Sequence, residues 1–145
     1  MKLPLKRISL VLSSVPPVFL LLWAWHLRFL AGCCRGSSPA DARICDLAVR
    51  HYPSDTMRLT LLEEKVRHLR ETGDTAAEAA GLAVIAGLYE TGRAKLPDRA
   101  MLGIYQRLVF LYSKIGNAGE AYRYGGDAHR LHDRIIRARS GSGGF

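Results

Sequence analysis

The feature that most constrains this chain is an apolar run near its N-terminus. No ionisable side chain occurs in the 18 residues of the range Ile8–Trp25. Three basic residues precede the run: Lys2, Lys6 and Arg7. The run is long for the core of an export signal and just short of the about 20 residues that span a bilayer. Pro16 and Pro17 weaken a continuous spanning helix more than a signal. We therefore expect residues 1–32 to be a signal peptide or a membrane anchor.

The tetrapeptide Leu30-Ala31-Gly32-Cys33 follows this run. It resembles the lipobox of bacterial lipoproteins at every position. The resemblance implies that Cys33 receives a diacylglyceryl group on its thiol, a good nucleophile, and that a peptidase removes residues 1–32. Because position 34 is not aspartate, the resemblance also favours the outer membrane over retention in the inner one. The alternative is an uncleaved anchor, which is consistent with the ionisable residues His26 and Arg28 before the motif.

The chain has three cysteines, at positions 33, 34 and 45. If lipid occupies Cys33, then Cys34 and Cys45 remain as an even pair, the count expected for a disulfide in an oxidising compartment. The alternative is that both stay reduced. No spacing of cysteine and histidine completes a four-ligand zinc site, so we expect no metal and no other cofactor.

The formal charge of the chain is +8, from 21 basic and 13 acidic residues. Residues 33–145 carry 17 of the basic residues and all 13 acidic ones, an excess of four. These basic residues are spread along the sequence rather than clustered. Since nucleic-acid binding needs a concentrated basic face, we expect a solvated helix surface and no nucleic-acid partner.

The remainder of the chain has a helical pattern. Apolar residues recur at spacings of three and four, and no strand-like alternation occurs. The predicted order is a flexible tether (33–40), a short helix (42–51) capped by Asp41, a helix from Asp55 or Thr56 to Gly73, helices at 75–91, from Pro97 to Gly116 and at 118–138, and a disordered tail (140–145). Short connections make neighbouring helices antiparallel. We therefore predict an all-α domain over residues 41–139.

Two stretches of this domain are similar, residues 73–79 and 116–121, at a distance of 42 residues. Each follows one amphipathic segment and opens another, which resembles the tetratricopeptide repeat, a helix-turn-helix unit of 34 residues. The second unit, 101–134, has the favoured residue types at Tyr105, Leu108, Tyr112, Gly116, Ala121 and Ala128. It departs from the family at Val109, where a small residue is usual, and at Gly125, where an aromatic one is usual. The resemblance implies a protein-binding scaffold; the alternative is a four-helix array with repeat-like packing.

No residue pattern points to catalysis, so we predict that the chain is not an enzyme and has no small-molecule substrate. Glu78 and Glu120 are the candidate acids, but a helix start lowers a carboxyl pKa rather than raising it. His129 and His132 lie one turn apart without the further ligands that a metal site needs.

The last predicted helix carries the candidate partner-binding residues. Tyr122 and Arg123 are expected to face outward, with the composition of a protein interface. Arg130, Arg134, Arg137 and Arg139 form a basic end, which suits anionic lipid headgroups or an acidic partner.

These observations predict a lipoprotein of the bacterial cell envelope, held by the acylated Cys33 in the outer membrane and facing the periplasm. It would serve as a helical scaffold or assembly subunit of a secretion, conjugation or pilus complex, with membrane lipid and other envelope proteins as partners. These complexes are named because small helical modules of this kind are commonest in them. The alternative is an inner-membrane adaptor with an uncleaved anchor; a cell-wall-active enzyme comes last.

Overall fold

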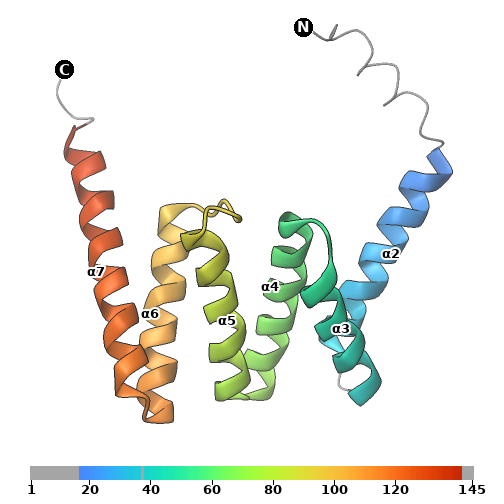
Figure 1. Cartoon of the computed structure of the whole chain (residues 1–145), viewed down its shortest axis with the longest axis horizontal. Helices are drawn as coiled ribbons and strands as arrows, with labels where there is room; N and C mark the ends of the chain where they lie inside the picture. Colours follow the sequence, from blue (N-terminus) through green and yellow to red (C-terminus); the bar gives the residue numbers. More distant parts are fainter. Residues whose placement is uncertain (1–16, 37, 142–145) are drawn as a thin grey trace, which may run out of the picture.

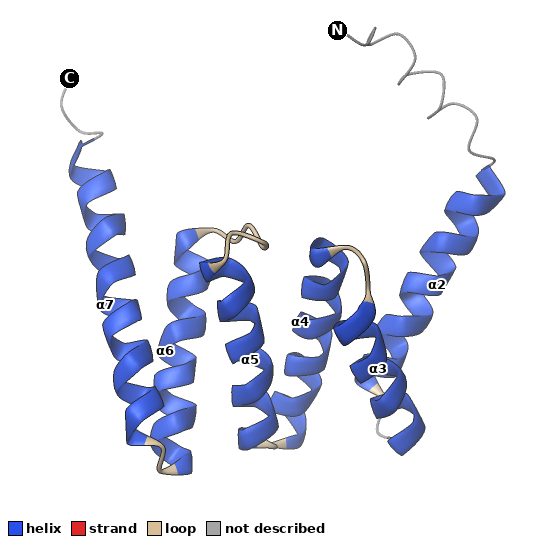
Figure 2. Ribbon diagram, viewed as in Figure 1, coloured by secondary structure: helices blue, strands red, loops and turns tan. Residues whose placement is uncertain are grey.

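The computed structural model describes residues 17–36 and 38–141, which contain helices and their connections and no strand (Figures 1 and 2). The helices are α2 (Pro17–Arg35), α3 (Pro39–His51), α4 (Asp55–Thr72), α5 (Thr75–Glu90), α6 (Asp98–Ile115) and α7 (Ala118–Gly141). The prediction of an all-α fold is confirmed.

Consecutive helices are antiparallel and lie side by side (Figure 1). From α4 to α7 each helix packs on the next, and we call these four helices the helical row. α2 packs on both α3 and α4, so the first three helices form a three-helix unit at one end of the row. The N-terminal half of α2 and the C-terminal half of α7 project beyond the other helices on the same side of the molecule (Figure 1).

The helix ends in the row largely follow the local signals in the sequence. Gly73 and Gly116 end α4 and α6 in the left-handed conformation, with φ of 79° and 84°. Glycine adopts this conformation without the steric cost that a Cβ would bring. α7 runs to Gly141, through the first two residues of the tail predicted for 140–145. The remainder of that tail lies outside the described residues.

The flexible tether predicted for residues 33–40 is mostly helical in the structure. α2 continues to Arg35, and α3 begins at Pro39. Ser38 caps α3 in place of Asp41, because its hydroxyl accepts a hydrogen bond of 3.0 Å from the Asp41 amide. Proline fits the next position, where the helix needs no amide donor. The connection between α2 and α3 is therefore short.

The main apolar core lies inside the helical row. Its most deeply buried large side chains come from α5 and α6: Ile85, Met101, Leu108 and Leu111. Aromatic rings extend this core between α6 and α7. The ring centroid of Tyr124 is 5.7 Å from that of Tyr112 and 6.0 Å from that of Tyr105. Aromatic pairs at such distances add to the stabilisation that burial itself provides.

The α6–α7 hairpin contains two departures from the repeat pattern, and they lie opposite each other. A Cβ atom added to Gly125 would be 4.0 Å from Cγ2 of Val109. The larger residue is thus on α6 and the smaller one on α7, which keeps a large side chain packed against a small one. Tyr124, one position before Gly125, places the aromatic ring against Tyr112.

Candidate functional site

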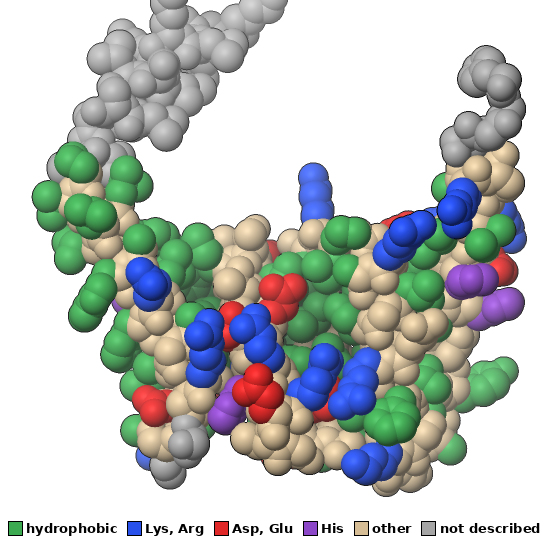
Figure 3. All heavy atoms as spheres, turned by 180° about the vertical axis from the view of Figure 1, so that it is seen from behind, with side chains coloured by type: hydrophobic (Ala, Val, Ile, Leu, Met, Phe, Trp, Pro, Cys, Tyr) green, Lys and Arg blue, Asp and Glu red, His purple; other side chains and the backbone are tan. Residues whose placement is uncertain are grey.

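α2 has an exposed apolar part, which is the first candidate for function. All of its large apolar side chains between Val18 and Phe29 except Leu27 are 48–70% exposed. They cover the projecting end of the helix (Figure 3): Val18, Phe19, Leu20, Leu21, Leu22, Trp23, Trp25 and Phe29. Among the described helices, α2 is the one long and apolar enough to cross a membrane, a test that an N-terminal signal sequence also passes. This part of α2 packs on little of the protein, so its apolar surface needs another cover.

The last turns of α2 are buried in the three-helix unit. Leu30, Cys33 and Cys34 are 6%, 5% and 3% exposed. Leu30 and Cys34 form a small core with Cys45 of α3 and Leu61 of α4. The same helix therefore changes within a few residues from an exposed apolar rod to a packed element of the domain.

Aromatic contacts extend this packing toward the exposed part of α2. The ring of Trp23 lies 6.0 Å from that of Tyr52, which follows α3, and the ring of His26 lies 6.5 Å from it. An apolar hollow of about 350 Å³ between the two helices is lined by residues that include Leu30, Ile44 and Tyr52.

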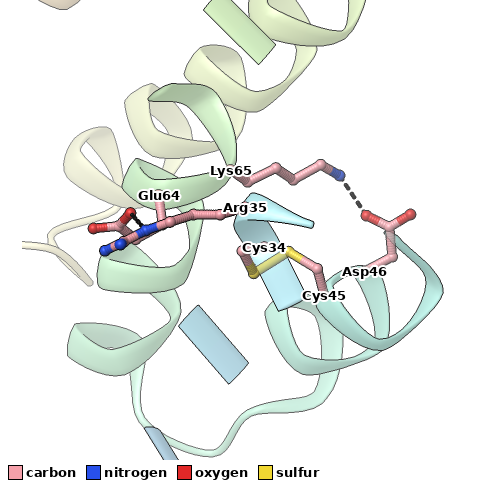
Figure 4. The surroundings of a disulfide bond; sticks show 6 residues. All are labelled: Cys34, Arg35, Cys45, Asp46, Glu64 and Lys65. Atoms are coloured by element: carbon pink, nitrogen blue, oxygen red, sulfur yellow. Dashed lines mark hydrogen bonds and ion pairs between the residues drawn. A yellow bond between two sulfur atoms is a disulfide. The ribbon is translucent and has the colours of Figure 1, made fainter. Parts of the chain in front are cut away.

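A disulfide joins Cys34 of α2 to Cys45 of α3, the pair expected from the sequence if lipid occupies Cys33 (Figure 4). Two ion pairs lie beside it (Figure 4). Nε of Arg35 donates to Oε2 of Glu64 at 2.6 Å, which joins α2 to α4. The Lys65 ammonium pairs with the carboxylate of Asp46, which joins α4 to α3. The hydrogen bond from Arg35 holds the pKa of Glu64 below its usual range. These links fix α2 to the domain with little freedom.

The candidate lipidation residue Cys33 is the free cysteine of the three, and it is buried. Its side chain lines a hollow of about 340 Å³ together with the two disulfide cysteines, His68 and Leu69. In this arrangement the thiol does not face solvent. Transfer of lipid to the Cys33 thiol would therefore have to take place before α2 packs on α4.

The candidate partner-binding residues lie in two separate places on α7. Tyr122 is 87% exposed, while the Arg123 guanidinium pairs with Glu120 at 2.7 Å and lies 4.2 Å from the centre of the Tyr124 ring. Eight residues separate Tyr122 from Arg130, about 12 Å along a helix. The structure therefore does not bring the two groups together.

Arg130 and Arg134 line a polar hollow of about 430 Å³ between α5, α6 and α7. Arg130 pairs with Asp127. The hydroxyl of Tyr105 in this hollow donates to Glu90 at 3.0 Å. Burial, and then this hydrogen bond, raises the pKa of Tyr105 well above its usual range. The hollow therefore presents a neutral tyrosine, the Arg130–Asp127 ion pair and the guanidinium of Arg134.

Glu78 has a role that sequence reasoning missed. Its side chain is 3% exposed, and it accepts hydrogen bonds from Arg70 of α4 at 2.9 Å and from Arg107 of α6 at 3.0 and 2.8 Å. Burial by itself raises the pKa of Glu78, but the hydrogen bonds from Arg107 and Arg70 outweigh it and lower the pKa. Glu78 is thus an ionised link between three helices. The described residues contain no group of three His, Cys, Asp or Glu side chains placed to hold a metal ion.

Comparisons with protein-family models, with curated proteins and with solved structures find no match to this chain.

Proposed function

We propose that this chain is a membrane-anchored helical scaffold of the bacterial cell envelope, with α2 as its anchor. The observation that carries the proposal is the double character of α2: its first half is apolar and exposed, and its last turns are packed and cross-linked. A bilayer is the cover that suits this exposed part, because the apolar run of 18 residues from 8 to 25 is close to the about 20 residues that span one.

The Cys34–Cys45 disulfide supports a domain on the periplasmic side of the membrane. Disulfides form and persist in oxidising compartments and are rare in the cytosol. The basic residues ahead of the apolar run support the same orientation, since positive flanks stay cytoplasmic. As a scaffold, the domain would act through its helix surfaces, as the resemblance to tetratricopeptide repeats implies, with other envelope proteins as partners and no catalysis.

The packing favours the form of the protein in which residues 1–32 are retained. Cleavage before Cys33 would remove Leu30 from the small core and the rings of Trp23 and His26 from Tyr52. Each lost contact would expose apolar surface on α3 and α4. The retained form corresponds to an inner-membrane scaffold or adaptor.

The second candidate is the lipoprotein form, which the Leu30-Ala31-Gly32-Cys33 motif favours. In that form the acylated Cys33 is the first residue, and the disulfide at Cys34 would hold the lipid directly against the domain. The outer membrane is then the expected location.

The intact mass of the full chain, expressed in a Gram-negative host and extracted from the membrane, tests the two forms. A mass that includes Met1 supports the retained anchor, and Cys33→Ala should then leave both mass and membrane association unchanged apart from the substituted atoms. A species that begins at Cys33 and carries a diacylglyceryl group and an acyl chain, lost in Cys33→Ala, supports the lipoprotein. Recovery of the chain in the soluble fraction would contradict both.

A further inference from the structure

Two edges of the molecule can be defined by the direction in which α2 projects (Figure 1). The anchor edge contains the ends and connections on the side of the projecting half of α2: residues 48–58, 88–99 and 133–141. The opposite edge contains residues 33–36, 38–43, 69–79 and 113–123. The antiparallel arrangement brings segments far apart in the sequence together at each edge.

The two edges differ in charge. The anchor edge holds eight basic and four acidic residues, and the opposite edge holds five of each. The remaining residues between 33 and 145 hold four of each. The whole excess of four positive charges in this part of the chain therefore lies at the anchor edge. Its basic residues are Arg50, Arg58, Arg93, Lys95, Arg99, Arg134, Arg137 and Arg139. Figure 3 shows basic side chains gathered on the projecting end of α7.

The acids of the anchor edge are already engaged within the protein. Asp55 pairs with Arg93 at 2.8 Å and with Arg58 at 3.2 Å. Asp98 accepts a hydrogen bond of 2.7 Å from Tyr89, and Glu90 accepts the one from Tyr105. Oδ2 of Asp133 lies 3.6 Å from Nε2 of His129.

Several of the bases are not engaged in this way. Lys95, Arg99 and Arg137 are exposed, and no acidic partner for them occurs among the described residues. They extend over the α5–α6 connection, the start of α6 and the end of α7, so positive charge is available along this edge.

We propose that the anchor edge lies against anionic headgroups of the bilayer that holds α2. This inference rests on the proposed function in its retained form. α2 leaves the bilayer at this edge, and the disulfide and the Arg35–Glu64 pair fix its direction relative to the row. Lysine and arginine near an anionic surface are attracted to it within about a Debye length. The row is thereby held by α2 at one end and by α7 at the other.

The lipoprotein form would place the bilayer differently. Cys33 lies at the end of α2 that belongs to the opposite edge, about 24 Å along the helix from Pro17. A lipid on Cys33 would therefore bring the membrane to an edge with balanced charge. The asymmetry of charge fits the retained anchor and not the acylated cysteine.

The test uses the full chain in nanodiscs of either phosphatidylglycerol or phosphatidylcholine. A fluorescent donor is attached at Ser140→Cys in a Cys33→Ala background, and acceptors are placed on lipid headgroups. We expect higher energy transfer in the anionic discs, reduced to the phosphatidylcholine value in 1 M salt, where the Debye length is about 3 Å. Equal transfer in both lipids would overturn the proposal.

Two charge-matched variants locate the effect. Lys95→Gln with Arg137→Gln removes two bases from the anchor edge and should abolish the lipid difference. Arg43→Gln with Lys114→Gln removes two exposed bases from the opposite edge and should preserve it. The same loss in both variants would contradict a role for the anchor edge. Failure of the anchor itself gives a distinct result: the chain would not co-elute with phosphatidylcholine discs, and both proposals would then fall.

Discussion

The three-helix unit and the helical row are held together in different ways. α2 and α3 contribute three of the four buried residues of a small core, which Leu61 of α4 completes and which a disulfide and two ion pairs reinforce. The row has a continuous apolar core and one buried carboxylate that links α4, α5 and α6. Covalent and ionic bonds thus compensate for limited apolar burial where the anchor meets the domain. The comparison implies that the junction, and not the row, responds to redox conditions.

The largest expected effect is loss of a core leucine from the row. Leu108 is 0% exposed, and Leu108→Ala should lower the free energy of unfolding by about 4 kcal/mol, because it removes buried methylene groups and leaves a cavity. Leu61→Ala should cost about 3 kcal/mol and act mainly on the three-helix unit. Urea denaturation with hydrogen exchange by region measures both. Equal loss of protection in α7 for the two variants would contradict a division between unit and row.

The next effect concerns the buried carboxylate of the row. Glu78→Ala leaves Arg70 and Arg107 without their shared partner and should lower the free energy of unfolding by about 3 kcal/mol. This value is at the lower end of the range for broken buried ion pairs, because both arginines are partly exposed. Glu71→Ala, an exposed acid on α4, is the control and should be near neutral. Thermal unfolding of the two variants measures the difference.

The contribution of Glu78 should also depend on pH. Its pKa is lower in the folded state than its usual 4.5, so the stabilisation is complete above that value and is lost as the pH falls through the folded pKa. The difference in melting temperature between the unsubstituted protein and Glu78→Gln should therefore shrink below pH 4.5. A difference in melting temperature that stays constant at all acidic pH values would argue against an ionised Glu78.

Removal of the disulfide should affect the junction alone. Cys34 and Cys45 are 11 residues apart, and a loop of that size corresponds to about 3 kcal/mol. Cys45→Ser in a Cys33→Ala background, or reduction of that background, should lower hydrogen-exchange protection in α3 and the end of α2. Protection in α5, α6 and α7 should stay the same. Unchanged protection in α3 would mean that the apolar contacts of the unit suffice without the bond.

The smallest effects distinguish two helical glycines of the row. A Cβ at Gly81 would be 2.7 Å from Cγ2 of the buried Val66, so Gly81→Ala should destabilise by about 1–3 kcal/mol. A Cβ at Gly125 would make an ordinary contact with Val109, so Gly125→Ala should stabilise by about 0.5–1 kcal/mol through helix propensity. Chemical denaturation measures both signs. Opposite signs are the expected result, and destabilisation by both would show that α7 packs more tightly on α6 than the structure implies.

Much of the fold follows from local signals. Two helices of the row, α4 and α6, end at Gly73 and Gly116 as predicted, because a left-handed cap depends on one residue and its immediate neighbours. The helix α3 begins earlier than predicted, because the side chain of Ser38, and not that of Asp41, caps its N-terminus. Glu78 could be named from the sequence as an acid but not as an ion-pair centre. Its partner Arg107 is 29 residues away and meets it only when α5 and α6 pack.

The sequence alone determined that the chain is helical and that an apolar segment precedes the domain, and it indicated Cys34 and Cys45 as a pair only on the assumption that Cys33 carries lipid. Those properties depend on composition and short spacings. Only the tertiary structure decided that Cys33 is buried and that eight of the 17 basic residues between 33 and 145 come from segments that share one edge. In the sequence these residues are spread over some 90 positions and indicate no patch. Antiparallel packing brings alternate connections to the same side, so a dispersed charge becomes a concentrated one.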